Sequence, residues 1–133
     1  MIVDTSAIIA IVRNEPEGAV FLNRLIDARS AGEATRISAA TLVELTTVVD
    51  RYGEIKAARL LDALLAELRL DVVPVDAAQA AVARAANRAF GKGFHPARLN
   101  LGDCFTYALA RQAGEPLLFK GDDFSQTDVE SAV

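Results

Sequence analysis

The chain has 133 residues, of which 52% are hydrophobic and 24% charged, and its formal net charge is −4. This length predicts a single domain spanning residues 1–133, and the apolar fraction is enough for a hydrophobic core, which excludes disordered and low-complexity classes. No apolar run approaches the roughly 18–20 residues that a membrane span needs, and the N-terminus lacks the basic lead-in of a signal peptide. We therefore expect a cytoplasmic protein with no membrane partner.

The first half of the chain alternates short β-branched or apolar runs with longer helical patterns. Pro16 favours the first turn of a helix, and apolar residues from Ile55 to Leu68 recur at helical spacing. In chain order, we expect a strand at 1–3, helices at 6–13 and from near 16 to 28, a strand at 36–38, a helix reaching about 51, and an amphipathic helix at 55–68.

The second half continues the alternation. A strand is predicted over 72–75, although Pro74 is unfavourable inside a strand. Asp76 caps an alanine-rich helix that ends near Phe90. A further helix at 101–113 is closed by Gly114, and 117–119 is the last strand.

Strands that alternate with helices predict a parallel sheet covered on both faces, and in such sheets the ligand site lies beyond the carboxyl ends of the strands. Asp4 directly follows the first strand, and Asp122 and Asp123 follow the last. The functional site is expected at that edge.

Carboxylates occupy positions that a solvated surface would not obviously select: Asp4, Glu44, Asp103 and the pair Asp122 and Asp123. Glu44 borders the apolar stripe of its helix, and Asp103 lies in the first turn of the helix at 101–113. Carboxylates that lie close together repel one another unless a cation compensates, and oxygen ligands suit Mg²⁺ or Mn²⁺. Such an ion favours hydrolysis of a phosphodiester.

Each acid also has a structural interpretation. Asp4 and Asp123 are typical N-caps, and Asp103 complements a helix dipole. Thr41 and Glu44 have the spacing of a capping box, in which the glutamate reaches back to the threonine amide. Taken singly, these interpretations are favoured, but they leave unexplained why the caps gather at one edge of the sheet.

Four blocks in order and spacing resemble a known family. They are residues 1–7 (Met-Ile-Val-Asp-Thr-Ser-Ala), 37–44, 100–105 and 117–124. The sequence resembles PIN-domain ribonucleases, specifically the VapC toxins of bacterial toxin–antitoxin pairs, over essentially the whole chain.

The resemblance implies a three-layer α/β/α sandwich with a mainly parallel sheet, whose acids hold one or two Mg²⁺ or Mn²⁺ ions and cut single-stranded RNA. By position, Asp4 and Asp103 are the principal metal ligands, Glu44 is the third acid and Asp123 the fourth, with Asp122 in reserve. The polar residues that match those around the acids are Thr5, Ser6 and Asn100.

Several further residues have two interpretations, a functional one and an ordinary structural one. Lys92, His95, Arg98 and Lys120 lie near the acids in sequence and are expected to contact RNA phosphates or to be plain surface. His95 cannot be placed in a catalytic triad. Cys104 has helical spacing with apolar neighbours, so a buried structural thiol is favoured over a nucleophile.

The helices between residues 16 and 68 carry more Leu, Val and Ile than one core face requires. In the family that the chain resembles, such a surplus serves homodimerisation and docking of a VapB-like antitoxin. Core packing is the rival explanation.

Two other functions compete with a metal-dependent endoribonuclease. A phosphatase could use Asp4 as nucleophile, but that chemistry usually has a second acid two residues on, where Ser6 stands. A non-catalytic interaction module would use the acids only as caps. The acidic net charge does not exclude RNA, because without Asp4, Glu44, Asp103 and Asp123 the chain has 14 acidic and 14 basic residues.

Overall fold

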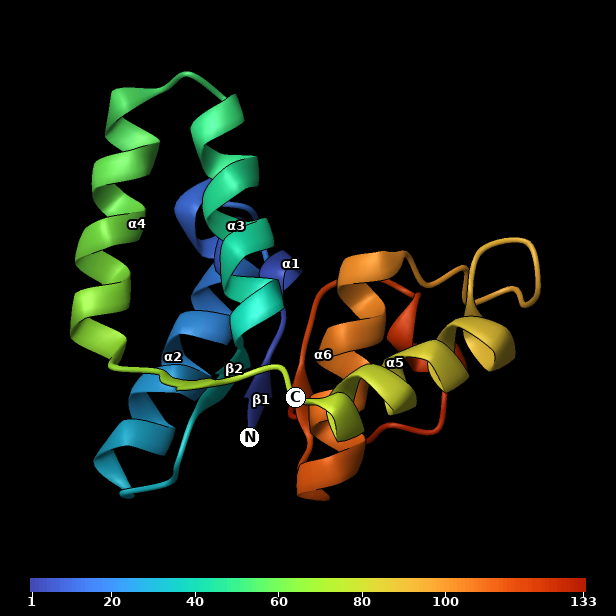
Figure 1. Cartoon of the computed structure of the whole chain (residues 1–133). Coiled ribbons are helices and arrows are strands. Elements are labelled where there is room, and N and C mark those ends of the chain that lie inside the picture. Colours follow the sequence, from blue (N-terminus) through green and yellow to red (C-terminus); the bar gives the residue numbers. More distant parts are fainter.

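The computed structural model describes residues 1–133, and every predicted strand and helix is present within two residues of its expected bounds (Figure 1). None of the helices is long and apolar enough to cross a bilayer. The elements are β1 Ile2–Val3, α1 Thr5–Val12, α2 Gly18–Ser30, β2 Arg36–Ser38, α3 Ala39–Arg51, α4 Ile55–Leu68, β3 Asp71–Val73, α5 Ala77–Phe90, α6 Leu101–Ala113, β4 Leu117–Leu118 and the 3₁₀ turn η1 Phe124–Gln126.

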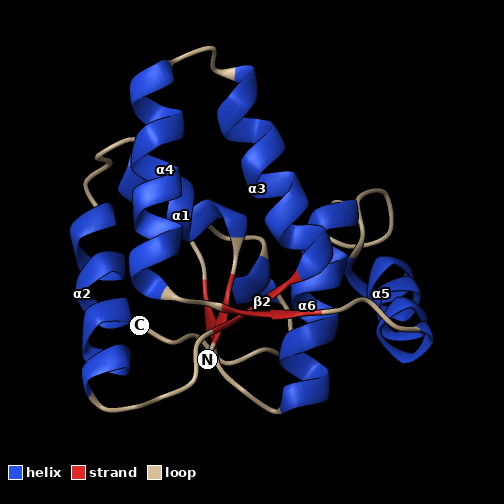
Figure 2. Cartoon of the chain, turned by 60° about the vertical axis from the view of Figure 1, so that its left-hand side comes forward, coloured by secondary structure: helices blue, strands red, loops and turns tan.

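The four strands form one parallel sheet in the order β3-β2-β1-β4, which lies at the centre of the molecule (Figure 2). Ile2 of β1 is opposite Arg36 of β2 and Leu117 of β4, and Val3 is opposite Leu118. The first and last strands of the chain are therefore neighbours, and the loops that leave their carboxyl ends start side by side.

Helices cover both faces of the sheet. Successive residues of a strand point to opposite faces, so one strand contributes side chains to two cores. Val3, Ile37 and Leu118 pack into a core shared with α1 to α4. Ile2 and Leu117 pack into a second core shared with α5 and α6. The expected three-layer α/β/α sandwich is confirmed.

The strand predicted over 72–75 ends earlier than expected. β3 stops at Val73, directly before Pro74. A proline has no amide hydrogen to donate to a sheet ladder, so pairing with β2 ends where that donor is lost. Residues 74 and 75 instead lead into Asp76, whose side chain accepts a hydrogen bond from the Gln79 amide at 2.7 Å and caps α5 as predicted.

Candidate active site

Asp4 lies between the end of β1 and the start of α1, and its side chain is 3% exposed. Its Oδ2 accepts hydrogen bonds from the Ser6 amide at 2.9 Å and from the Ser6 hydroxyl at 2.6 Å. Its Oδ1 accepts one from the Thr106 hydroxyl at 2.9 Å. Ser6 Oγ in turn accepts a hydrogen bond from the Lys120 amide, so the segment after β4 is attached to the same carboxylate. Asp4 is thus the N-cap that the sequence predicted, held on both oxygens.

Glu44 does not form the capping box predicted with Thr41. Ser38 ends β2, so α3 begins already at Ala39 and places Thr41 inside the helix. The Thr41 hydroxyl lies 2.9 Å from that of Thr106, and Glu44 Oε2 instead accepts a hydrogen bond from the Thr5 hydroxyl at 3.1 Å. The cap interpretation of Glu44 is therefore wrong, and its carboxylate is directed to the edge of the sheet where Asp4 lies.

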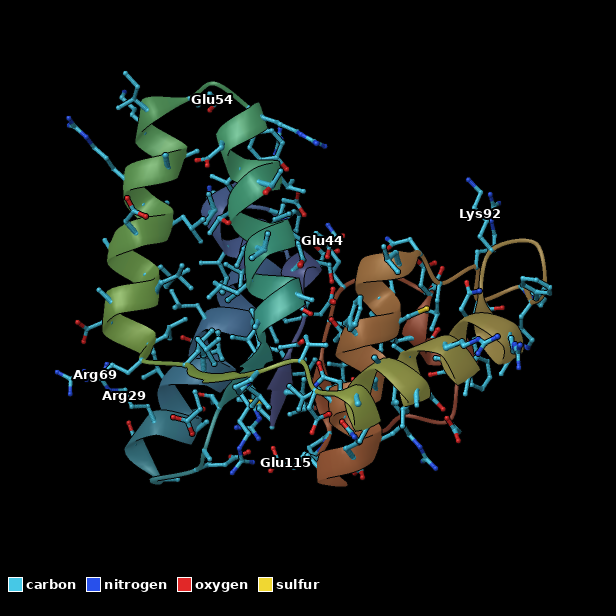
Figure 3. All side chains as sticks on the ribbon, in the orientation of Figure 1. Arg29, Glu44, Glu54, Arg69, Lys92 and Glu115 are labelled. Atoms are coloured by element: carbon cyan, nitrogen blue, oxygen red, sulfur yellow. The ribbon has the colours of Figure 1, made fainter.

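The Glu44 carboxylate is also packed against the first turn of α6. A Cβ atom added at Gly102 would lie 2.2 Å from Glu44 Oε2 and 2.4 Å from Oε1, so only glycine leaves room for the carboxylate there. Burial, and to a lesser extent the charge of Asp4, raises the pKa of Glu44. Figure 3 shows Glu44 directed from α3 into the gap that separates α3 from α6.

Asp103 lies in the first turn of α6 and is half-buried. It forms a reciprocal capping box with Asn100: the Asn100 amide donates to Asp103 Oδ2 at 2.7 Å, and the Asp103 amide donates to Asn100 Oδ1 at 3.1 Å. Burial is the main cause that raises the pKa of Asp103 to about 7; the Asn100 amide lowers this pKa, and the charges of Asp4, Glu44 and Asp123 contribute smaller increases. Carboxylates from four separate segments are thus close enough to interact.

Asp123 follows the sharp turn at Gly121, where φ is +95°, a value that favours glycine. Asp123 precedes η1 but forms no side-chain cap, so its predicted capping role is not observed. Asp123, and not Asp122, is among the groups that raise the pKa of Asp103. Both side chains are exposed, so exposure does not distinguish them. The effect on the pKa of Asp103 favours Asp123 as the fourth acid.

The donor chemistry of these acids fits a hard divalent cation. All are carboxylates, and Mg²⁺ in proteins is commonly held by one or two carboxylates together with water. No group of three or more acidic, histidine or cysteine side chains is arranged tightly enough in this structure to hold an ion. The residues that could contribute ligands are Asp4, Glu44, Asp103 and Asp123, with part of the coordination left to water or substrate.

The basic residues near the acids differ in what they contact. Lys92 and Arg98 are exposed and form no ion pair. Lys120 Nζ lies 2.6 Å from the Glu15 carboxylate, which neutralises it locally. His95 Nδ1 accepts a hydrogen bond from the Ala97 amide at 3.1 Å, so this ring atom orders its own loop.

Cys104 is 1% exposed and belongs to the core formed by α5, α6 and the sheet. Burial raises the pKa of its thiol to about 11, with a further contribution from Asp103. A thiol is a nucleophile only as the thiolate. The expected structural role is confirmed.

Thr106 is a site residue that the sequence analysis missed. It is fully buried, and its hydroxyl contacts both Asp4 Oδ1 and Thr41 Oγ1. It lies one helical turn after Asp103, on the same face of α6. The sequence did carry a signal for it: a polar residue three positions after Asp103, among apolar neighbours.

Comparisons with known proteins agree with this geometry. Residues 1–130 match the PIN domain family. The chain is 50% identical over 133 residues to the VapC ribonuclease Mb2780c of Mycobacterium bovis, covering 99% of this chain and 98% of that protein. It is 47% identical over 134 residues to ribonuclease VapC28 of Mycobacterium tuberculosis, covering 100% and 98%.

A solved structure shares the fold. Mycobacterium tuberculosis VapC20, described as a sarcin–ricin loop cleaving toxin, superposes with a TM-score of 0.71 over 96% of this chain and 95% of that one, at 19% identity. The full-length match to the family and the identity to its curated members place this chain among them: it belongs to the PIN-domain family and, within it, to the VapC ribonuclease toxins.

Proposed function

We propose that this chain hydrolyses phosphodiester bonds in single-stranded RNA with one or two Mg²⁺ or Mn²⁺ ions held by Asp4, Glu44, Asp103 and Asp123. The observation that carries the proposal is that Asp4, Glu44 and Asp123, from separate segments, lie close enough for their charges to add to the effect of burial, which is the main cause that raises the pKa of Asp103 to about 7. Such mutual repulsion is a cost that a bound cation removes.

A bound divalent ion would polarise the phosphoryl group and lower the pKa of a water molecule. The protein's part is to hold the acids in place. Ser6 and Thr106 orient both oxygens of Asp4, Thr5 orients Glu44, and the Asn100 amide orients Asp103. With its pKa near 7, Asp103 exchanges its proton for a cation at little cost near neutral pH.

The phosphodiester substrate requires positive charge beside the acids. Lys92 and Arg98, both exposed and unpaired, support contact with phosphates, whereas Lys120 is engaged by Glu15 and Glu17. VapC20 is described as cleaving the sarcin–ricin loop. That RNA is therefore one defined substrate to test beside total cellular RNA.

The proposed partners are a VapB-like antitoxin and a second copy of this chain. The apolar surplus predicted between residues 16 and 68 is not absorbed by the core. Large apolar side chains there stay between 47% and 71% exposed, and they are Val20, Ile26, Val43, Ile55 and Leu60. They lie on α2, α3 and α4, and α4 packs against both other helices, so their exposure on neighbouring elements supports a covering partner.

The phosphatase alternative is disfavoured by the surroundings of Asp4. Ser6 stands where that chemistry usually has its second acid, and its amide and hydroxyl both donate to Asp4 Oδ2 instead. The cap-only interpretation is weakened at Glu44 and Asp123, neither of which caps a helix.

The test is cleavage of total cellular RNA by the purified protein with and without Mg²⁺, with the cut ends mapped. We expect Glu44→Gln to abolish metal-dependent cleavage with little change in thermal stability, because the amide keeps an oxygen to accept from Thr5. Glu54→Gln is the matched control, since Glu54 lies at the far end of α3 and α4, away from the cluster (Figure 3). Full cleavage by Glu44→Gln would refute the metal role.

The ligand assignment is tested separately by calorimetric titration with Mn²⁺. Asp4→Asn and Asp103→Asn should each remove metal binding and also toxicity on expression. Unchanged titrations in both variants would contradict the assignment. Asp123→Asn compared with Asp122→Asn decides the fourth acid, and we expect only the former to lower cleavage.

A further inference from the structure

A cleft of about 470 Å³ lies between α5 and α6, on the side of α6 remote from α3. Asn100 and Leu101 line it, and the same helical turn presents Asp103 to the other acids. The cleft therefore adjoins the carboxylates through a single turn of α6. Its volume is within the range of about 300–1,000 Å³ that is usual for ligand sites.

The walls of the cleft are apolar. Leu99, Leu101, Cys104 and Phe105 contribute to them. Leu101 is 77% exposed, although half of the residues that follow it in α6 are buried. Because Leu101 also lines the cleft, its exposed side chain belongs to an apolar wall that a ligand in the cleft would cover.

The rim of the cleft is polar and positively charged. Arg84 and Asn87 of α5 and Lys92 of the following loop line it, and no acidic residue does. Arg84 and Lys92 form no ion pair with any carboxylate, unlike Lys120. The Asn87 side chain is exposed and makes no hydrogen bond within the protein. Figure 3 shows Lys92 extending from its loop away from the helices.

This combination identifies the occupant by its chemistry. A nucleobase has two apolar faces and an edge that carries both donors and acceptors, and it is joined to anionic phosphates. A primary amide offers both a donor and an acceptor to such an edge, and arginine and lysine bind phosphate. An apolar peptide would leave Arg84 and Lys92 without partners.

We propose that the α5–α6 cleft binds one nucleobase of the RNA strand adjacent to the scissile phosphate, with Asn87 reading the base edge and Arg84 and Lys92 binding the flanking phosphates. The proposal rests on the proposed function, because the base in the cleft would belong to the RNA strand that the acids hydrolyse. Asn87 is then a residue that determines base preference.

Binding is tested first, without divalent metal. Each of the four ribonucleoside 5′-monophosphates is titrated into ¹⁵N-labelled protein in EDTA, with ribose 5-phosphate as the probe that lacks a base. We expect shifts of the Asn87 side-chain amide and of the Leu101 and Cys104 backbone amides that differ among the bases and are absent with ribose 5-phosphate. The cleft proposal is overturned if ribose 5-phosphate reproduces those shifts, or if nucleotides perturb another surface.

Cleavage is tested next with hexaribonucleotides that vary one base at a time. Asn87→Leu, close in size but without polar atoms, should lower kcat/KM about 10- to 100-fold for the preferred base at one position and reduce the preference there. Asn23→Leu is the matched control, because Asn23 is an exposed residue of α2, in the layer on the opposite face of the sheet (Figure 1). Unchanged preference in Asn87→Leu overturns the proposal.

The two proposals fail separately. Base-dependent shifts at Asn87 without metal-dependent cleavage of any RNA would refute the proposed function and its scissile phosphate, and would leave the cleft as a nucleobase-binding site only. Metal-dependent cleavage without base-dependent shifts at Asn87 would refute the nucleobase site alone.

Discussion

We expect Gly102→Ala to lower RNA cleavage while leaving the stability of the fold unchanged, a clearer separation of the two than removal of a carboxylate would give. The added Cβ would lie 2.2 Å from Glu44 Oε2, whereas ordinary contact begins at 3.4 Å, so the carboxylate oxygen must retreat by about 1.2 Å. A misplacement of about 1 Å in a catalytic group costs about 100-fold in rate. We therefore expect kcat/KM for metal-dependent RNA cleavage to fall by about that factor.

The same substitution should leave folding intact. The group that must move is the end of a flexible glutamate side chain, and alanine is favoured over glycine inside a helix by about 0.5–1 kcal/mol. Urea denaturation should therefore show unchanged or slightly raised stability. A loss of stability above about 1 kcal/mol would mean that the backbone of α6, and not the carboxylate, has shifted.

Glu44→Asp provides the control background. Its carboxylate is one methylene shorter and is drawn back from Gly102, so the alanine methyl has less to displace. Gly102→Ala should cost much less in this background than in the wild type, which is a non-additivity expected for residues in contact. Full activity of Gly102→Ala, or an equal loss in both backgrounds, would refute the reasoning.

Three further outcomes follow from the surroundings of the acids. Because burial raises the pKa of Asp103 from 3.8 to about 7, the folded metal-free protein should lose stability as the pH rises from about 4 to 7, by at most about 4 kcal/mol from this group. Urea denaturation in EDTA should show this decline, and Asp103→Asn should reduce it to the part that Glu44, whose pKa burial also raises, contributes. Thr106→Val should destabilise the protein by about 1–3 kcal/mol and lower cleavage, because Asp4 loses a buried hydrogen bond, whereas Thr106→Ser should retain both properties. Cys104 should react with a thiol reagent only after unfolding, and Cys104→Ala should keep cleaving RNA; loss of cleavage in a folded Cys104→Ala would restore the nucleophile interpretation.

The elements of this fold could be predicted from local signals. Gly114 has φ of +63° at the end of α6, as a C-terminal glycine should, and Asp76 caps α5 through the Gln79 amide. β1 and β4 were recognisable as short apolar runs, because both are fully buried and have no polar side to alternate with. Pro74 was the one unfavourable residue inside the strand predicted over 72–75, and it marks the place where β3 ends too early for that prediction.

The details of the site depended on contacts that no local pattern encodes. The spacing of Thr41 and Glu44 is that of a capping box, but the motif has meaning only if the helix begins at Thr41. The N-cap of α3 is instead Ser38, three residues before Thr41, and Glu44 accepts a hydrogen bond from Thr5 of a distant segment. Such pairings arise from tertiary packing and are invisible to spacing rules.

Capping a helix and binding a metal ion are compatible roles for one carboxylate. A carboxylate has about four acceptor positions, and a cap bond that uses one of them fixes the remaining ones in space. Asp4 uses three, in bonds from Ser6 and Thr106, while Asp103 uses one, in the bond from Asn100. Asp103 therefore keeps the greater capacity to accept a cation, and its capping box is what holds that capacity toward the other acids.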